Sequence, residues 1–379
     1  MNRRQLIILL VLVLVVGGAA WLHSRKQSAA WLRPDAAVGA KLLGDFQVND
    51  VARIRMQHGA NAVDLVQTNG LWRVQERGGY PADFSQISRL LLKLRDLKIV
   101  QTEQIGLSQR PRLELAAPGP ATNSATLLAF YDAGGKPVRT LWLGKSHQHE
   151  STPPSVTREM GDQGWPDGRY VLAATNAGLV ALIADPLSEA NPDAGQWLDK
   201  TFFKVEKPRS VSVAYPIATN SWALVNETNG WQLANARPDE KLDESQASET
   251  ADSLASPSFS DVAVGMSAQR TGLAHPTAIG IKTADGFSYA ISVGAKTNDS
   301  YFLTVSVSAA LAKTNAPDES KRLADKLAQE SKLNGWTYLV PEWTLEPMLK
   351  KRTQLLVVKS VETETNSPAT NALAGPASR

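Results

Sequence analysis

Hydrophobic and polar residues alternate along the chain once a long apolar opening has passed. Val63 and Leu65 share one face of an extended segment, with polar neighbours between them. A period of two is typical of half-buried antiparallel strands, and Asn69-Gly70 supplies the positive backbone angles that a tight hairpin needs. The pattern therefore predicts strands joined by turns, which we expect at 51–56, 62–67 and 71–76.

The spacing changes from strand-like to helical after Asp83. Asp83 and Gln86 form a capping-box signature, and the apolar residues that follow fall on one stripe. Such a stripe is expected to pack on the sheet. Two further strands, 125–131 and 138–143, predict a second hairpin through Gly134 and Gly135. The stripe consists of Phe84, Ile87, Leu90, Leu91, Leu94 and Leu97.

The same landmarks recur in the same order roughly 160 residues later. The hairpin residues 68–72 are matched by 228–231, and the strand end at Leu143-Gly144 is matched by Val293-Gly294. Four such matches in one order indicate an internal duplication. The second half has a poorer helix at 243–254, since its apolar positions are mostly alanine. The remaining matches are 169–172 with 300–303, and 200–203 with 352–356.

These patterns predict an α+β fold. We expect an N-terminal transmembrane helix followed by two similar domains of antiparallel sheet with packed helices, the second domain containing a helical excursion at 318–333. The last residues carry little apolar bulk and are expected to be disordered. The expected boundaries are 1–26 for the anchor or signal segment, 27–44 for a linker, 45–206 and 207–360 for the two domains, and 361–379 for the tail.

The opening segment predicts where the chain resides. Arg3 and Arg4 precede an uncharged run from Leu6 to Leu22, which is long enough to favour an uncleaved anchor. The small residues 18–20 also permit a cleaved signal peptide, and both alternatives send the rest of the chain out of the cytoplasm. We expect a single-pass protein of the inner (cytoplasmic) membrane, with its bulk periplasmic or extracytoplasmic. The complete absence of cysteine suits an envelope location.

Composition narrows the function classes. The 379 residues are 43% hydrophobic and 20% charged, with a formal net charge of +3. This is an ordinary globular balance without the basic excess that favours nucleic acid, so no nucleic-acid partner is expected.

The best candidate for metal chemistry is a short histidine cluster. His147, His149 and Glu150 place two imidazoles and a carboxylate within four residues, and alternate residues of a strand point to one side. The surrounding serine, threonine and proline residues are typical of a solvated surface loop. No nucleophile elbow, dinucleotide fingerprint or phosphate-binding loop occurs in the sequence. We therefore expect no enzyme activity, no metal and no cofactor.

Tryptophan supplies the candidates for ligand binding. Trp72, Trp142 and Trp231 lie in strands at inward-facing positions and are expected in the core. Trp165 and Trp343 lie near turns or element ends, where an exposed aromatic ring marks a surface for a ligand or partner.

The ordered landmarks resemble a bacterial family, the domain of unknown function 4340. The resemblance rests on the Asn-Gly-Leu-Trp hairpin, on residues 80–83 before the apolar helix, and on the closing residues 336–355. Members of this family are often encoded beside the permease, ATPase and auxiliary subunits of gliding-motility-type ABC systems. The resemblance implies an accessory envelope component, and it implies no catalytic residues.

The leading functional expectation is a non-enzymatic, membrane-anchored scaffold of an ABC-type complex, with the membrane and these subunits as partners. An envelope carbohydrate-binding module that uses exposed tryptophans is the alternative. A metal-dependent hydrolase at His147 and His149 comes third.

Overall fold

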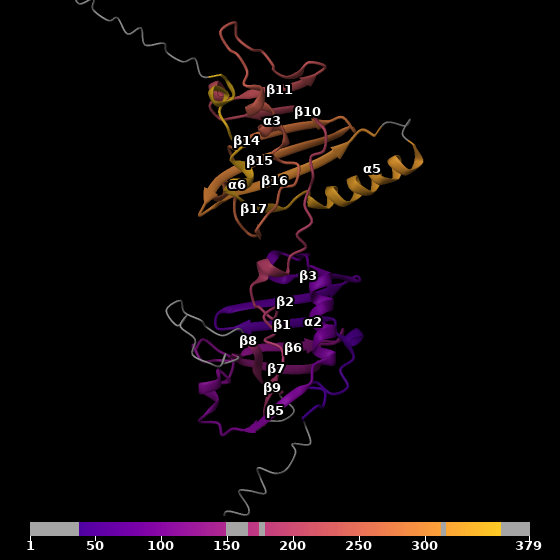
Figure 1. The fold of residues 1–379 in the computed structure, drawn as a ribbon, viewed down its shortest axis with the longest axis vertical. Coiled ribbons are helices and arrows are strands. Elements are labelled where there is room, and N and C mark those ends of the chain that lie inside the picture. The colour runs from indigo at the N-terminus through magenta and orange to yellow at the C-terminus, as the bar shows by residue number, and fades with distance from the viewer. Residues whose placement is uncertain (1–37, 149–165, 174–178, 312–315, 358–379) are drawn as a thin grey trace, which may run out of the picture. The chain divides into compact units, whose positions relative to one another are not determined.

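The computed structural model describes residues 38–148, 166–173, 179–311 and 316–357. The chain divides into two compact units, residues 1–200 and 201–379, whereas the sequence-based boundary is 206–207. Each unit is built on one antiparallel sheet, and Figure 1 labels most of the strands.

Unit 1 contains a nine-stranded sheet in the order β4-β3-β2-β1-β6-β7-β8-β9-β5. Its core lies on the face that carries Ile54, Met56 and Leu65, each fully buried. The strands are β1 (Arg53–His58), β2 (Asn61–Thr68), β3 (Leu71–Val74), β4 (Tyr80–Pro81), β5 (Ile99–Gln104), β6 (Thr126–Tyr131), β7 (Pro137–Gln148), β8 (Pro166–Ala173) and β9 (Leu179–Ile183).

Helix α2 (Phe84–Asp96) contributes to this core as its apolar stripe predicted. The Asp83 carboxylate accepts a hydrogen bond from the backbone N–H of Gln86, which caps the helix. Four stripe residues are buried, whereas Phe84 is 62% exposed. The buried residues are Ile87, Leu90, Leu91 and Leu94.

A second, smaller cluster lies around strands β8 and β9. The segment that contains the 3-10 helix η3 (Arg110–Leu113) brings Leu115 against Leu172 and Val180, and Trp142 packs against this group. The expected linker also contributes structure, because the Gly39 N–H donates to the Ile99 carbonyl over 2.8 Å.

Unit 2 contains an eight-stranded sheet in the order β12-β11-β10-β14-β15-β16-β17-β13. The helices are α3 (Glu244–Asp252), α4 (Ala268–Thr271), α5 (Pro317–Glu330) and α6 (Glu342–Leu345). The strands are β10 (Pro208–Ala214), β11 (Trp222–Glu227), β12 (Gly230–Leu233), β13 (Asp261–Ala263), β14 (Thr277–Thr283), β15 (Phe287–Thr297), β16 (Ser300–Ala309) and β17 (Thr337–Pro341).

The two sheets have the same strand order once β4 is set aside. Their long central hairpins also share an irregularity: the register shifts between Leu143 and Ser146 in β7, and between Val293 and Lys296 in β15. A side chain at Gly144 would collide with the Leu113 carbonyl, and one at Gly294 with the Thr271 carbonyl. Because glycine has no side chain, each of these two positions lets a loop pass close to the strand beside the bulge.

The strand pairing corrects one sequence match. Arg169 lies opposite Ser146, and Tyr301 lies opposite Lys296, so Arg169 is the counterpart of Tyr301. The sequence match had paired Arg169 with Ser300 instead of Tyr301. A shift of one residue would place every side chain of the strand on the opposite face of the sheet.

The predicted α+β class with an N-terminal transmembrane helix is wrong for this structure. The architecture is mostly antiparallel sheet, and α2, α3 and α5 are the only helices longer than four residues in the described ranges. Helix α5 buries only Leu323 and Glu330. None of the described helices is long and apolar enough to cross a membrane. The expected anchor at 1–26 and the expected tail at 361–379 lie outside the described residues.

The class was misjudged because several strands carry no alternating pattern. Strand β5 reads Ile-Val-Gln-Thr-Glu-Gln and has no buried residue, so a period of two is missing. Strands β4 and β13 have only two and three residues.

Candidate functional site

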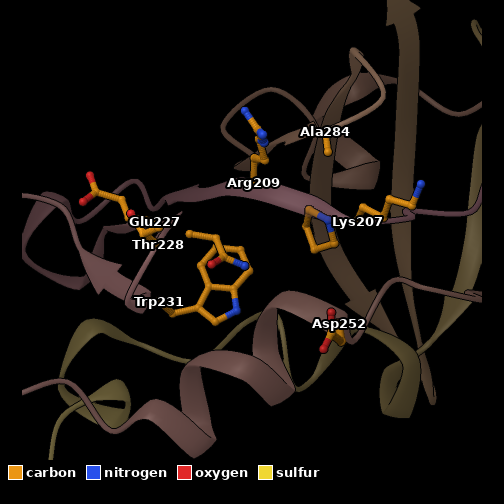
Figure 2. A pocket seen from close by; sticks show the side chains of 9 residues that line it. Lys207, Arg209, Glu227, Thr228, Trp231, Asp252 and Ala284 are labelled. Atoms are coloured by element: carbon orange, nitrogen blue, oxygen red, sulfur yellow. The ribbon is translucent and has the colours of Figure 1, made fainter. Parts of the chain in front are cut away.

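Unit 2 contains a hollow of about 800 Å³ between the end of helix α3 and the sheet. Figure 2 shows the Trp231 ring and the Asp252 side chain facing this space. The lining side chains combine one aromatic ring with charges of both signs. They are Lys207, Pro208, Arg209, Asn226, Glu227, Thr228, Trp231, Asp252 and Ala284.

The β11–β12 hairpin positions Trp231. Glu227 pairs with Gly230 across a two-residue turn, and Gly230 has a φ of 100°. Trp231 lies two residues before the buried Leu233, so both side chains point to the same face. The counterpart in unit 1 is Trp72, which is only 6% exposed. Trp231 is half-buried.

Helix α3 contributes its last residue, Asp252, to the lining, and its buried positions carry small side chains. Its cap is Asp243, whose carboxylate accepts from the N–H groups of Ser245 and Gln246. Four and eight residues after this cap the chain has Ala247 and Ala251. The same offsets from Asp83 in unit 1 carry isoleucine and leucine, so α3 fills less of the space beneath its sheet.

The charged groups around the hollow are mostly free to meet a ligand. Lys207 makes a long contact with Asp285, with Nζ and Oδ1 3.4 Å apart. Arg209, Glu227 and Asp252 form no ion pair within the described ranges. Because exposed cations and carboxylates hydrogen-bond readily, these three side chains offer donors and acceptors at the rim.

The arrangement is suited to recognition. An indole face stacks on flat or apolar groups, and the Asn226 amide and the Asp252 carboxylate add directional hydrogen bonds. The lining holds neither histidine nor cysteine.

Of the three predicted metal ligands, the structure describes only His147. His147 lies near the end of β7, and its Nδ1 is 2.7 Å from Oδ1 of Asp167. His149 and Glu150 lie outside the described residues. Among the residues that the structure describes, no group of three histidine, cysteine, aspartate or glutamate side chains is arranged to hold a metal ion.

The structure describes one of the two tryptophans that were predicted at the surface. Trp343 lies on α6 and is 68% exposed. Trp165 falls outside the described ranges. Trp142 packs against the smaller cluster of unit 1, and Trp72 is in the core.

Sequence reasoning assigned Trp231 to the core and therefore missed the hollow. The face of the sheet was predicted correctly, because Trp231 and Leu233 share it. The signal that could have found the hollow was the weakness of the helix at 243–254, which the sequence shows but which was not combined with the position of Trp231: its alanines leave a large ring on the same face incompletely covered.

A separate polar cluster fixes α5 to its sheet. Glu330 is 5% exposed and accepts hydrogen bonds from the Lys204 N–H at 3.0 Å and the Tyr289 hydroxyl at 2.9 Å. Burial raises the pKa of Glu330. Lys326 donates to Glu206 at 2.8 Å, and this bond lowers the pKa of Glu206. All of these groups have partners, so the cluster is structural.

Comparison with protein families gives one match. The model of a family described as a domain of unknown function (DUF4340) matches residues 72–277, more than half of the chain. The matched stretch begins in β3 of unit 1 and ends at the start of β14 in unit 2. Neither the curated proteins nor the solved structures contain a match.

Proposed function

The chain belongs to the DUF4340 family, and from this premise we propose that it is a non-enzymatic accessory or scaffold protein of an ABC-type membrane complex. The family resemblance supports the partners, which are the permease, ATPase and auxiliary subunits. An extracytoplasmic location at the inner membrane is part of the proposal. It rests on the uncharged run 6–22, which lies outside the described residues.

The observation that carries the proposal is the hollow at Trp231. A half-buried aromatic ring is surrounded by Arg209, Glu227 and Asp252, none of which has an ion-pair partner within the described ranges. These three charged side chains are exposed at the rim of the hollow. Uncommitted groups around an aromatic ring are suited to contacts with another molecule.

The test is purification of the tagged full-length protein from its native membranes in mild detergent, with mass spectrometry of the associated proteins. We expect stoichiometric recovery of permease and ATPase subunits. Trp231→Ala is expected to reduce this recovery, while the matched Trp343→Ala leaves it unchanged. Recovery of the chain alone, from a preparation in which the ABC complex itself stays intact, would contradict the proposal.

Carbohydrate binding is the second candidate function, and the exposure of Trp343 favours it. An aromatic ring exposed over 68% of its surface can stack on a sugar ring. A glycan array probed with the full-length protein tests this candidate. Binding that is lost on Trp343→Ala and kept on Trp231→Ala would promote it over the scaffold.

A further inference from the structure

Strand β12 leaves one edge of the unit 2 sheet open. It pairs with β11 on one side and is the terminal strand in the sheet order. Gln232 pairs with Val225, and the Ala234 N–H donates to the Ala223 carbonyl, so the even-numbered residues face β11. Main-chain groups alternate in direction along a strand. Those of Trp231 and Leu233 therefore point outward, and no described loop or strand hydrogen-bonds to them.

The same edge in unit 1 is covered by the chain itself. The Trp72 carbonyl accepts from the Ala82 N–H at 2.9 Å, and the Val74 carbonyl accepts from the Gly79 N–H at 3.0 Å. These bonds attach β4 antiparallel to β3 and bury Tyr80 to 3% exposure. This edge of the repeat can therefore pair with one additional strand, and in unit 1 that strand is β4 of the same unit.

In unit 2 the segment before the helix cap does not lie along the sheet edge. Tyr80 lies three residues before the helix cap Asp83, and Glu240 lies three residues before the cap Asp243. The Glu240 carboxylate accepts from Nη2 of Arg352 at 2.7 Å and from the Arg237 N–H at 2.8 Å. This segment is held by Arg352 and does not pair with β12.

We propose that the open edge of β12 binds an extended polypeptide segment of a partner protein as an added antiparallel strand. The proposal rests on the accessory function and names the class of partner. A polypeptide backbone supplies N–H and carbonyl groups at the spacing that an open edge requires, which a sugar does not. The Trp231 ring, on the same strand, gives the incoming side chains an apolar contact.

Hydrogen exchange at single-residue resolution on the full-length chain tests the pairing. The probe is a synthetic peptide with the sequence of residues 77–84, which contains the strand that covers β3 in unit 1. We expect the amides of Trp231 and Leu233 to exchange about ten-fold more slowly with peptide bound. The amides of Gly230 and Gln232 already face β11 and serve as internal controls. A peptide of the same composition in scrambled order is the matched probe.

Each other outcome counts against the proposal. Unchanged exchange at Trp231 and Leu233 up to the solubility limit of the peptide overturns it. Protection confined to the amides of Lys207 and Asp252 means that the hollow binds without strand pairing. Slowing that depends on protein concentration without peptide assigns the edge to a second copy. The peptide test is independent of membrane co-purification, so failure of the accessory function is seen separately.

Discussion

Glu330 is a carboxylate that folding removes from water without giving it a close cation. The Lys326 ammonium is 3.9 Å away, and the closer contacts are the Lys204 N–H and the Tyr289 hydroxyl. Desolvation is the largest influence on its pKa and raises it above the ordinary value of 4.5. The exposed Glu206 behaves oppositely, because its hydrogen bond from Lys326 favours the ionised form.

These opposite shifts predict opposite pH dependences of stability. The folded state holds the Glu330 proton more tightly than the unfolded state. The stability contributed by this proton is therefore complete below pH 4.5 and is lost as the pH rises through the elevated folded pKa. Glu330→Gln should abolish this loss in the free energy of unfolding, measured by urea titration across pH 4 to 8, an interval chosen around the ordinary carboxyl range.

Glu206→Gln is the matched variant with the reverse sign. The contribution of Glu206 is present above its ordinary pKa and is lost as the pH falls through the lowered folded pKa. The substitution should reduce acid sensitivity only. If both substitutions changed the pH dependence of the free energy of unfolding in the same direction, neither carboxylate would titrate as described.

The face of Trp231 was predictable from the sequence, but its exposure was not. Periodicity states which face of a strand a residue occupies. Exposure depends on what covers that face, and Trp231 is covered by a helix whose inner positions are Ala247 and Ala251. The hollow is therefore a property of two segments together, and neither segment indicates it alone.

At the scale of elements, the bulged strand pairs β7–β8 and β15–β16 depend on one glycine each. Gly144 and Gly294 let a loop carbonyl approach where any Cβ would collide with it. The loop behind Gly144 brings Leu115 to its cluster, and the loop behind Gly294 contains α4.

Alanine at either glycine should therefore destabilise the protein. Gly144→Ala and Gly294→Ala are each expected to lower the free energy of unfolding by about 1–3 kcal/mol, because backbone must move to relieve the contact. Gly106→Ala is the control, since a Cβ there meets nothing within 4 Å. Denaturant titration of the three variants measures the effect. Equal stabilities in all three would mean that the loops shift freely.

Elements with strong local signals were predictable, and short edge strands were not. Helix α2 begins after Asp83 as the capping residue indicates, and the helical excursion predicted at 318–333 corresponds to α5, which begins one residue earlier, and to the short 3-10 helix η7 (Ser331–Leu333). Strand β4 has only two residues, and its pairing with β3 depends on the chain returning after the turn at Gly78. Local patterns do not encode such pairings.

At the scale of the whole molecule, each unit has its own buried core. Trp197 is fully buried in unit 1, and its indole N–H donates to the Asn191 carbonyl at 2.8 Å. In unit 2 the corresponding position is Leu355, whose carbonyl accepts from the Asp243 N–H as the Trp197 carbonyl accepts from Asp83. Units with separate cores are expected to unfold separately.

Trp197→Ala tests this independence. Removal of a buried tryptophan typically costs about 3–5 kcal/mol. We expect amide exchange in β1 and β2 to accelerate, while exchange in β14 and β15 remains unchanged. Leu355→Ala is the reciprocal variant in unit 2, with an expected cost of about 2–5 kcal/mol. Acceleration in both units by either variant would indicate one cooperative structure.

The connection before the last long strand differs most between the repeats. In unit 1, residues 174–178 separate β8 from β9, whereas in unit 2 the chain builds α5 between β16 and β17. The sheet order is the same despite this difference in length. The junction at 174–178 is therefore a suitable point for inserting an affinity tag or a fluorescent reporter, since the duplicated sheet already tolerates an added helix there.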